Sequence, residues 1–448
     1  MKNLFTSLCV LLLGVTTFAY AQEKSPDYRR SSLCLILMDE ANMPKRDTIR
    51  DAFLSAAMPE KYNDHNVMVR CFNPAELSLT SADEAAYNAA VAAAQESEHG
   101  GNAQATKRRS GFGNLMRDVA KTAVGSVSNT VDTASKSTYA IIANKYLLEE
   151  QVAKQLFDNW FIDENGEFSM ELIKERGLYD ASMMDVQTAK NSIRGMGMLE
   201  DAGEELINNT FVVVSRYRYI SKEELSAEIS AAADLVAQQF GIGGLGQVSN
   251  LAMSTSMGAG YYVRITSFLF QLNWNDDIAG TFYSQLWGNP EAYNAADIFS
   301  LKYIGQETAW ANVKAGVFTN KPEDELIRMA TINATDAVLA KLEKQFDVFK
   351  TKTPLASADP MMAYIGTKEG VEDGDKYEVL ERIVDPETNR TTYERKATVK
   401  VAKGQVWDNA YGAAEERAQE GEAVQQAGTR FEGSNRGLYP GMLLRQIK

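Results

Sequence analysis

Two apolar runs near the N-terminus enclose an amphipathic segment. SSLCLILMDE at 31–40 predicts a buried strand, and NVMVRCF at 66–72 predicts a second one. Between them, Ile49 and Phe53 recur at helical spacing, and Pro59 ends the segment. A strand, a helix and a strand at this spacing predict an α/β unit at the start of the folded chain.

The pattern changes beyond residue 81 and then returns to strands. Alanine-rich and weakly apolar sequence with helical spacing predicts a helical insertion at 82–200. TFVVVSRYRY at 210–219 and YYVRITSFLFQLNW at 261–274 predict strands. AGTFYSQLW at 279–287 follows a turn-rich tripeptide, so the segment 261–287 is expected to form a strand hairpin.

The C-terminal third begins with a long amphipathic helix at 322–350, opened by Pro322 and acidic residues. After it, short strands alternate with glycine turns. The chain is therefore predicted to be of the mixed α+β / α/β class, with an N-terminal α/β domain, a large helical insertion and a small β-barrel-like module. The expected divisions are a signal peptide at 1–21, the first part of the α/β domain at 22–81, the insertion at 82–200, the rest of that domain at 201–353 and the β module at 354–448.

The first residues have the layout of a secretory signal peptide. Lys2 supplies the positive charge, 4–18 is apolar, and Ala19-Tyr20-Ala21 provides small residues for cleavage. The apolar core is short for a membrane span. We expect cleavage after Ala21 and a periplasmic or extracellular location.

Charge and histidine content limit the chemistry. The net charge is −14, from 60 acidic and 46 basic residues, so nucleic acid is not expected as a partner. The chain has two histidines, and His65 is expected in an exposed turn before a strand. This composition argues against a histidine-rich zinc site, and no G-x-S-x-G elbow is present. No catalytic residue, metal or cofactor is therefore predicted.

Two cysteines and two threonines are candidates for modification. Cys34 and Cys71 remain after signal cleavage, and they permit one disulfide if their strands are neighbours. Two buried thiols in adjacent strands are the alternative. Thr48 and Thr133 each stand in an Asp-Thr-aliphatic tripeptide that resembles the O-glycosylation signal of Bacteroidetes envelope proteins, although Thr48 also suits the first turn of a helix.

The glycine turns of the C-terminal module carry a family resemblance. Ile365, Gly366, Gly370, Gly374 and Asp375 stand in an arrangement that resembles the C-terminal module of the flagellar assembly protein T family, which implies a small β-barrel. The upstream order of elements is similar to periplasmic domains of the curli secretion lipoprotein family, without that family's lipid-bearing cysteine. Phrases such as DAGEELINNTFVVV resemble uncharacterised secreted envelope proteins of Bacteroidetes.

The sequence favours a non-enzymatic protein that assembles or scaffolds envelope proteins. Exposed edges of the β module and of the hairpin at 261–287 are expected to supply the contacts. One alternative is a carbohydrate-active enzyme or sugar-binding protein. The other is a protein that contacts a membrane surface through 111–150. The acid and aromatic residues of the first alternative are Asp276, Asp277, Trp274 and Trp287.

Overall fold

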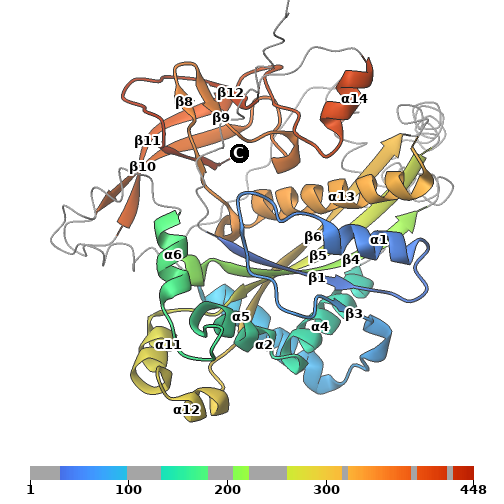
Figure 1. Ribbon diagram of the computed structural model, residues 1–448, viewed down its shortest axis with the longest axis vertical. Helices are drawn as coiled ribbons and strands as arrows, with labels where there is room; N and C mark the ends of the chain where they lie inside the picture. The colour runs from blue at the N-terminus through green and yellow to red at the C-terminus, as the bar shows by residue number, and fades with distance from the viewer. Residues whose placement is uncertain are drawn as a thin grey trace, which may run out of the picture.

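The structure is a computed structural model that describes residues 31–97, 133–179, 205–220, 260–314, 321–384, 391–420 and 427–447. The predicted signal peptide at 1–21 lies outside these residues. Helices and sheets are both abundant, in an α/β domain below and a β module above (Figure 1), which confirms the mixed α+β class and the barrel-like module.

The α/β domain is built on one sheet with the strand order β2-β1-β4-β5-β6, in which β3 also pairs with β1. β1 runs parallel to β2, β3 and β4, whereas β4, β5 and β6 are antiparallel. Every residue of β1 is buried, as expected for a strand with parallel neighbours and covered faces. The bounds are β1 Ser32–Met38, β2 Asn63–Asp64, β3 Cys71–Phe72, β4 Thr210–Ile220, β5 Gly260–Leu272 and β6 Leu301–Lys314.

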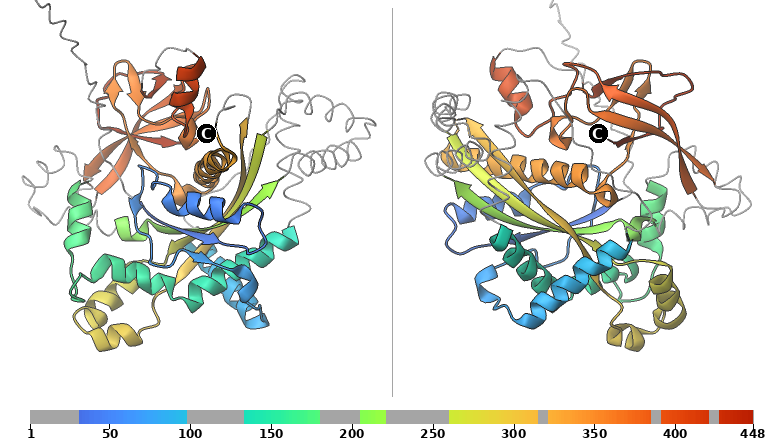
Figure 2. Two further views of the ribbon diagram at one scale, coloured as in Figure 1. Left: turned by 45° about the vertical axis from the view of Figure 1, so that its right-hand side comes forward. Right: turned by 180° about the vertical axis from the view of Figure 1, so that it is seen from behind.

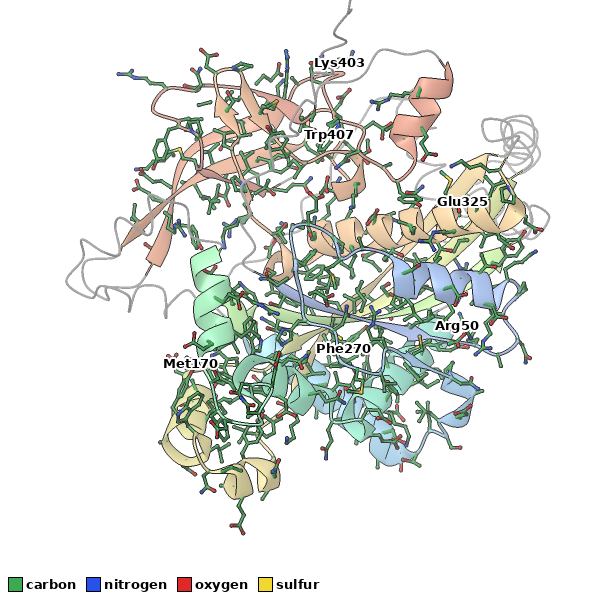
Figure 3. All side chains as sticks on the ribbon, viewed as in Figure 1. Arg50, Met170, Phe270, Glu325, Lys403 and Trp407 are labelled. Carbon is green, nitrogen blue, oxygen red and sulfur yellow. The ribbon has the colours of Figure 1, made fainter. Side chains whose placement is uncertain are left out.

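Helices cover both faces of this sheet (Figures 1 and 2). Side chains alternate along β1, so Leu33, Leu35 and Leu37 join one core, with α1 (Arg46–Ser55) and α13 (Glu323–Gln345). Cys34 and Ile36 join the opposite core, which also contains Phe270 (Figure 3). Its helices come from the predicted insertion: α2 (Ser81–Ser97), α4 (Thr133–Glu149) and α5 (Val152–Phe161), followed by α6 (Glu171–Tyr179).

The predicted hairpin at 261–287 is wrong. β5 pairs with β6, and 276–286 is helical, as α11 (Asp276–Thr281) and the π-helix η2 (Phe282–Leu286). The side chain of Asn275 caps α11 by accepting the amide of Ile278 at 2.9 Å. Phe282 and Leu286 of η2 are buried in the core, so tertiary burial favours a helix over the expected strand. α12 (Pro290–Ala295) follows before β6.

The second predicted strand, at 66–72, is also wrong in extent. The chain pairs with β1 only at β2 and β3 and leaves it between them. In the gap, the Asn66 side-chain oxygen accepts the backbone amide of Leu35 at 2.8 Å. A hydrogen bond from a side chain thus replaces one backbone hydrogen bond between the strands. The short helix η1 (Pro74–Glu76) follows β3.

The β module is a seven-stranded sheet with the order β7-β13-β10-β11-β12-β9-β8, curled around Val379, Val399 and Phe431. Gly370 and Gly374 have φ of +69° and +83°, which suits the predicted glycine turns. The strand bounds are β7 Thr353–Pro354, β8 Ser357–Ala358, β9 Met361–Ala363, β10 Lys376–Val384, β11 Thr391–Val401, β12 Thr429–Glu432 and β13 Leu443–Gln446. The helices of the module are η4 Thr367–Glu369 and α14 Ala413–Glu420, whereas η3 Asp347–Phe349 follows α13 and packs Phe349 into the core of the α/β domain.

The module rests on α13 (Figure 2). Lys344 on α13 lies 3.4 Å from the Asp375 carboxylate, and Lys321 lies 2.7 Å from Glu415 on α14. Gly370 follows η4 so close to the helix that an added Cβ would lie 2.8 Å from the Cβ of Ala340. The two parts are therefore in direct contact along α13.

Candidate functional site

A polar depression of about 570 Å³ opens beside the amino end of β1. Three elements line it: the loop after β2, the helix α5 and the helix α6. Carboxylate, amide and guanidinium groups meet there, so an occupant has to offer polar groups of its own. The lining residues are Asp64, His65, Asn66, Asp158, Asn159, Ile162 and Arg176.

His65 is buried at the base of this depression, with 2% of its surface exposed, which corrects the expected exposed turn. Its Nδ1 lies 2.8 Å from a guanidinium nitrogen of Arg176, and its Nε2 lies 3.0 Å from the carbonyl oxygen of Leu156. A guanidinium only donates, so Nδ1 accepts and Nε2–H donates. Burial and the charge of Arg176 lower the pKa of His65 to about 3. The imidazole is neutral and has no nitrogen left for proton transfer.

Arg176 joins α6 to the sheet. Its guanidinium carbon lies 4.5 Å from the centre of the Trp160 ring, and it donates to the carbonyl oxygen of Asp64 at 2.9 Å. Trp160 in turn donates from its indole nitrogen to the hydroxyl of Thr210 at 3.0 Å. This buried stack positions the loop after β2 and contains no nucleophile with an adjacent base.

α/β sheets often bind ligands at the carboxyl ends of two strands whose following segments go to opposite faces of the sheet. The chain leaves β1 and β3 in this way, so the carboxyl end of β1 is a second place to look for a site. Two acids stand there, and each is already paired. Arg46 donates to both oxygens of Asp39 at 2.7 and 2.6 Å. Arg216 donates to both oxygens of Glu40 at 2.8 and 3.2 Å, and the hydroxyl of Tyr139 donates to Glu40 at 2.8 Å. Each of the two acids is held by two hydrogen bonds from one arginine, so both acids have a structural role.

The described ranges contain no group of three or more His, Cys, Asp or Glu side chains placed to hold a metal ion. Asp276 and Asp277 are exposed in the first turn of α11. Trp274 is buried in the core with 5% exposure, and Trp287 packs against that core. The indoles therefore stabilise the fold, and the carboxylates point away from it.

Of the two alternatives for Cys34 and Cys71, the structure has two free thiols, with Cys34 buried and Cys71 half-buried. Cys71 lies opposite Leu37 in the pairing of β3 with β1, so it is three positions along the strand from Cys34. Cys34 belongs to one core, and Cys71 packs against the other. A disulfide requires Cα atoms within roughly 7 Å, with Cβ atoms directed toward each other, and side chains on opposite faces do not meet this condition.

The threonine and membrane predictions fall partly outside the described residues. Thr48 is half-buried in the first turn of α1 and lies 3.3 Å from an oxygen of Asp324. Thr133 begins α4, and its side chain is not described. Of the stretch 111–150, the described part is α4, which packs into the core through Ala140, Ala143 and Leu147. Among the helices of the described ranges, none is both long and apolar enough to cross a membrane.

The hairpin of β10 and β11 is the most extended part of the β module (Figure 1). β13 pairs with β10 over Tyr377–Leu380, and β12 pairs with β11 at Lys400 and Val401. In the part of the chain that the structure describes, 381–384 and 391–397 have no strand on their outer side. Among the described residues, the two strands therefore continue as a two-stranded ribbon beyond the strands that flank them.

The sequence reasoning missed the role of His65, Arg176 and Trp160, which lie far apart along the chain. The triplet Asp64-His65-Asn66 gave a turn signal but no sign of burial. The chain matches no model of a known protein family and no curated protein sequence.

Proposed function

We propose that this protein is a non-enzymatic assembly or scaffolding protein of the cell envelope. The carrying observation is the ribbon of β10 and β11, with its outer edges at 381–384 and 391–397. An unpaired strand edge offers backbone donors and acceptors to a strand of another protein. The resemblance of the module to the flagellar assembly protein T family adds support.

Charges on the ribbon select among partners. Glu394, Arg395 and Lys396 are exposed, and Lys396 is the extra residue where the register between β10 and β11 shifts. Within the ribbon Lys396 pairs with Glu381 at 2.8 Å and with Glu394 at 2.9 Å. Lysines and bulges at edges suppress indiscriminate pairing. The ribbon is therefore suited to a partner strand with complementary charge.

Site-specific photo-crosslinking tests this function. A benzophenone amino acid at Arg395 is expected to give one discrete covalent product in intact cells, and excess unmodified protein should compete it away. The same probe at Asp277, which is exposed on the α/β domain, is the matched control. Equal products from both positions, or no competition at Arg395, would refute assembly through the ribbon.

The proposed location has its own test. Export with cleavage after Ala21 predicts that the mature protein begins at Gln22 and is released with the periplasm or the medium. Cell fractionation followed by N-terminal sequencing checks it. A soluble cytosolic protein that still starts at Met1 would contradict export.

A further inference from the structure

One face of α13 is directed at the β module (Figure 2). Four residues of this helix are spaced by seven, four and four positions, and this spacing places their side chains on one side of it. We call these four residues the docking face: Met329, Asp336, Ala340 and Lys344. The first, third and fourth contact the module, so Asp336 stands in the middle of the surface that the module covers.

The contacts of the docking face are close. Met329 is buried beneath Gly412, where an added Cβ would overlap its terminal methyl group. Ala340 lies beneath Gly370, and its Cβ is 2.8 Å from the position that an added Cβ would take. Lys344 forms its ion pair of 3.4 Å with a carboxylate of the module. Water is therefore excluded from much of the contact around Asp336.

Other acids at this contact have partners, whereas Asp336 has none. Glu415 on α14 pairs with Lys321 at 2.7 Å. Glu369 of η4 accepts the backbone amide of Gly366 at 2.7 Å. Within the described residues, the half-buried carboxylate of Asp336 accepts no hydrogen bond and joins no ion pair. A carboxylate that loses water without gaining a donor is unfavourable in its ionised form.

Four titratable groups face Asp336 from the elements packed around it. Lys368 and Glu369 belong to η4, Lys61 follows α1, and Tyr217 lies on β4. Burial raises the pKa of Asp336 to about 6, against the lowering effect of Lys368. The charge of Glu369 raises this pKa further, and that of Lys61 lowers it. Burial also raises the pKa of Tyr217, so the phenol stays neutral while Asp336 titrates.

Lifting the module would return this carboxyl group to water. Its pKa would then move back toward the ordinary value of 3.8, so the docked state binds the proton more tightly than the undocked state. Docking stability linked to this group is therefore present at low pH and is lost as the pH rises through 6. The two pKa values make the docking constant about tenfold lower at pH 8 than at pH 5.

We propose that Asp336 makes the docking of the β module on α13 sensitive to pH. The module is held tightly when the carboxyl group is protonated, and it lifts from the helix more readily when the group is ionised. The ribbon of β10 and β11 belongs to the module, so its position relative to the α/β domain changes with the same titration. The inference does not depend on the proposed assembly function.

Alkylation of a thiol placed under the module measures how often the module lifts. In Met329→Cys the introduced thiol lies beneath Gly412 and reacts when the contact opens. Cys34, which is fully buried in the core of the α/β domain, reports unfolding of that domain in the same sample. Peptide mapping by mass spectrometry gives both rates, each divided by its rate in denatured protein at the same pH. The introduced thiol should react about tenfold faster at pH 8 than at pH 5, and faster than Cys34 at both pH values.

Two further substitutions assign the effect to Asp336. Asp336→Asn should reduce the tenfold ratio to less than twofold, whereas Asp277→Asn, which removes an exposed acid elsewhere on the α/β domain, should leave it unchanged. Slow alkylation of Cys34 shows that the domain of each variant is folded. The proposal would be overturned by a ratio that persists in Asp336→Asn, by an introduced thiol that reacts at neither pH, or by equal rates for that thiol and Cys34.

Discussion

Replacing Gly370 by alanine tests how closely the β module packs on α13. Gly370 has φ of +69°, and alanine in the left-handed region costs about 1 kcal/mol more than glycine. Its new Cβ would lie 2.8 Å from the Cβ of Ala340, well inside normal carbon contact. Overpacking of this kind costs about 1–3 kcal/mol, so we expect Gly370→Ala to lower the free energy of unfolding by about 2–4 kcal/mol.

Gly374 supplies the matched control. Its φ is +83°, and an added Cβ would meet no atom within 4 Å. Gly374→Ala should therefore cost only the backbone part, about 1 kcal/mol. The difference between the two variants isolates the contact with α13 from the strain in the turn.

A double-mutant cycle completes the test, with urea unfolding followed by circular dichroism. Ala340→Gly removes the opposing methyl group and costs about 1 kcal/mol as a helix substitution. In the Gly370→Ala background it should instead restore stability, with a coupling of about 1–3 kcal/mol. Equal losses for Gly370→Ala and Gly374→Ala, or no coupling with Ala340, would show that the module does not pack on the helix at this point.

Three further predictions concern titration and thiols. The pKa of His65 falls to about 3 in the folded state because of burial and Arg176, so the unfolded state binds more protons below pH 6.5 and stability is lost as the pH falls. Urea titrations should show wild type losing about 1.4 kcal/mol per pH unit more than His65→Gln between pH 6 and 4, and parallel curves would contradict this. Burial raises the pKa of Asp336 to about 6, which makes its ionised form a cost above that pH. Asp336→Asn should therefore raise the free energy of unfolding by about 1 kcal/mol at pH 8 and leave it unchanged at pH 4; a gain at both pH values would mean that ionisation is not its source. Mass spectrometry of the mature protein, which lacks Cys9 of the predicted signal peptide, should show two modified thiols after alkylation without reductant in denatured protein. In native protein Cys71 alone should be modified, because Cys34 is fully buried, whereas an unmodified pair after denaturation would indicate a disulfide.

Several elements could be predicted because their local pattern agrees with their final environment. The apolar run predicted at 31–40 contains the fully buried β1, and the strand predicted at 210–219 is β4. Pro322 and the acids after it stand at the start of α13. Glycines with positive φ mark the turns of the module. In each case, local propensity and burial favour the same structure.

The failures arise where distant contacts decide. AGTFYSQLW contains enough aromatic residues for a strand, but the ring of Phe282 packs 4.4 Å from that of Phe161, and this core requires the helical path. NVMVRCF is apolar enough for a strand, yet the side-chain oxygen of Asn66 accepts the amide of Leu35 where a backbone carbonyl oxygen would do so in a regular strand pair. His65 depends on Arg176 and Leu156, so neither its burial nor its neutral state has a local sequence signal.

The parallel contact between β1 and β4 affects how the chain folds. β1 ends at Met38, whereas its long neighbour β4 begins only at Thr210, so the first strand of the sheet pairs along its full length only with a segment made much later in synthesis. The antiparallel meander of β4, β5 and β6 needs shorter loop closures and is expected to form first. Until β4 is synthesised, β1 lacks its long partner strand. The sheet of the α/β domain therefore forms late, and the nascent chain stays unfolded for longer.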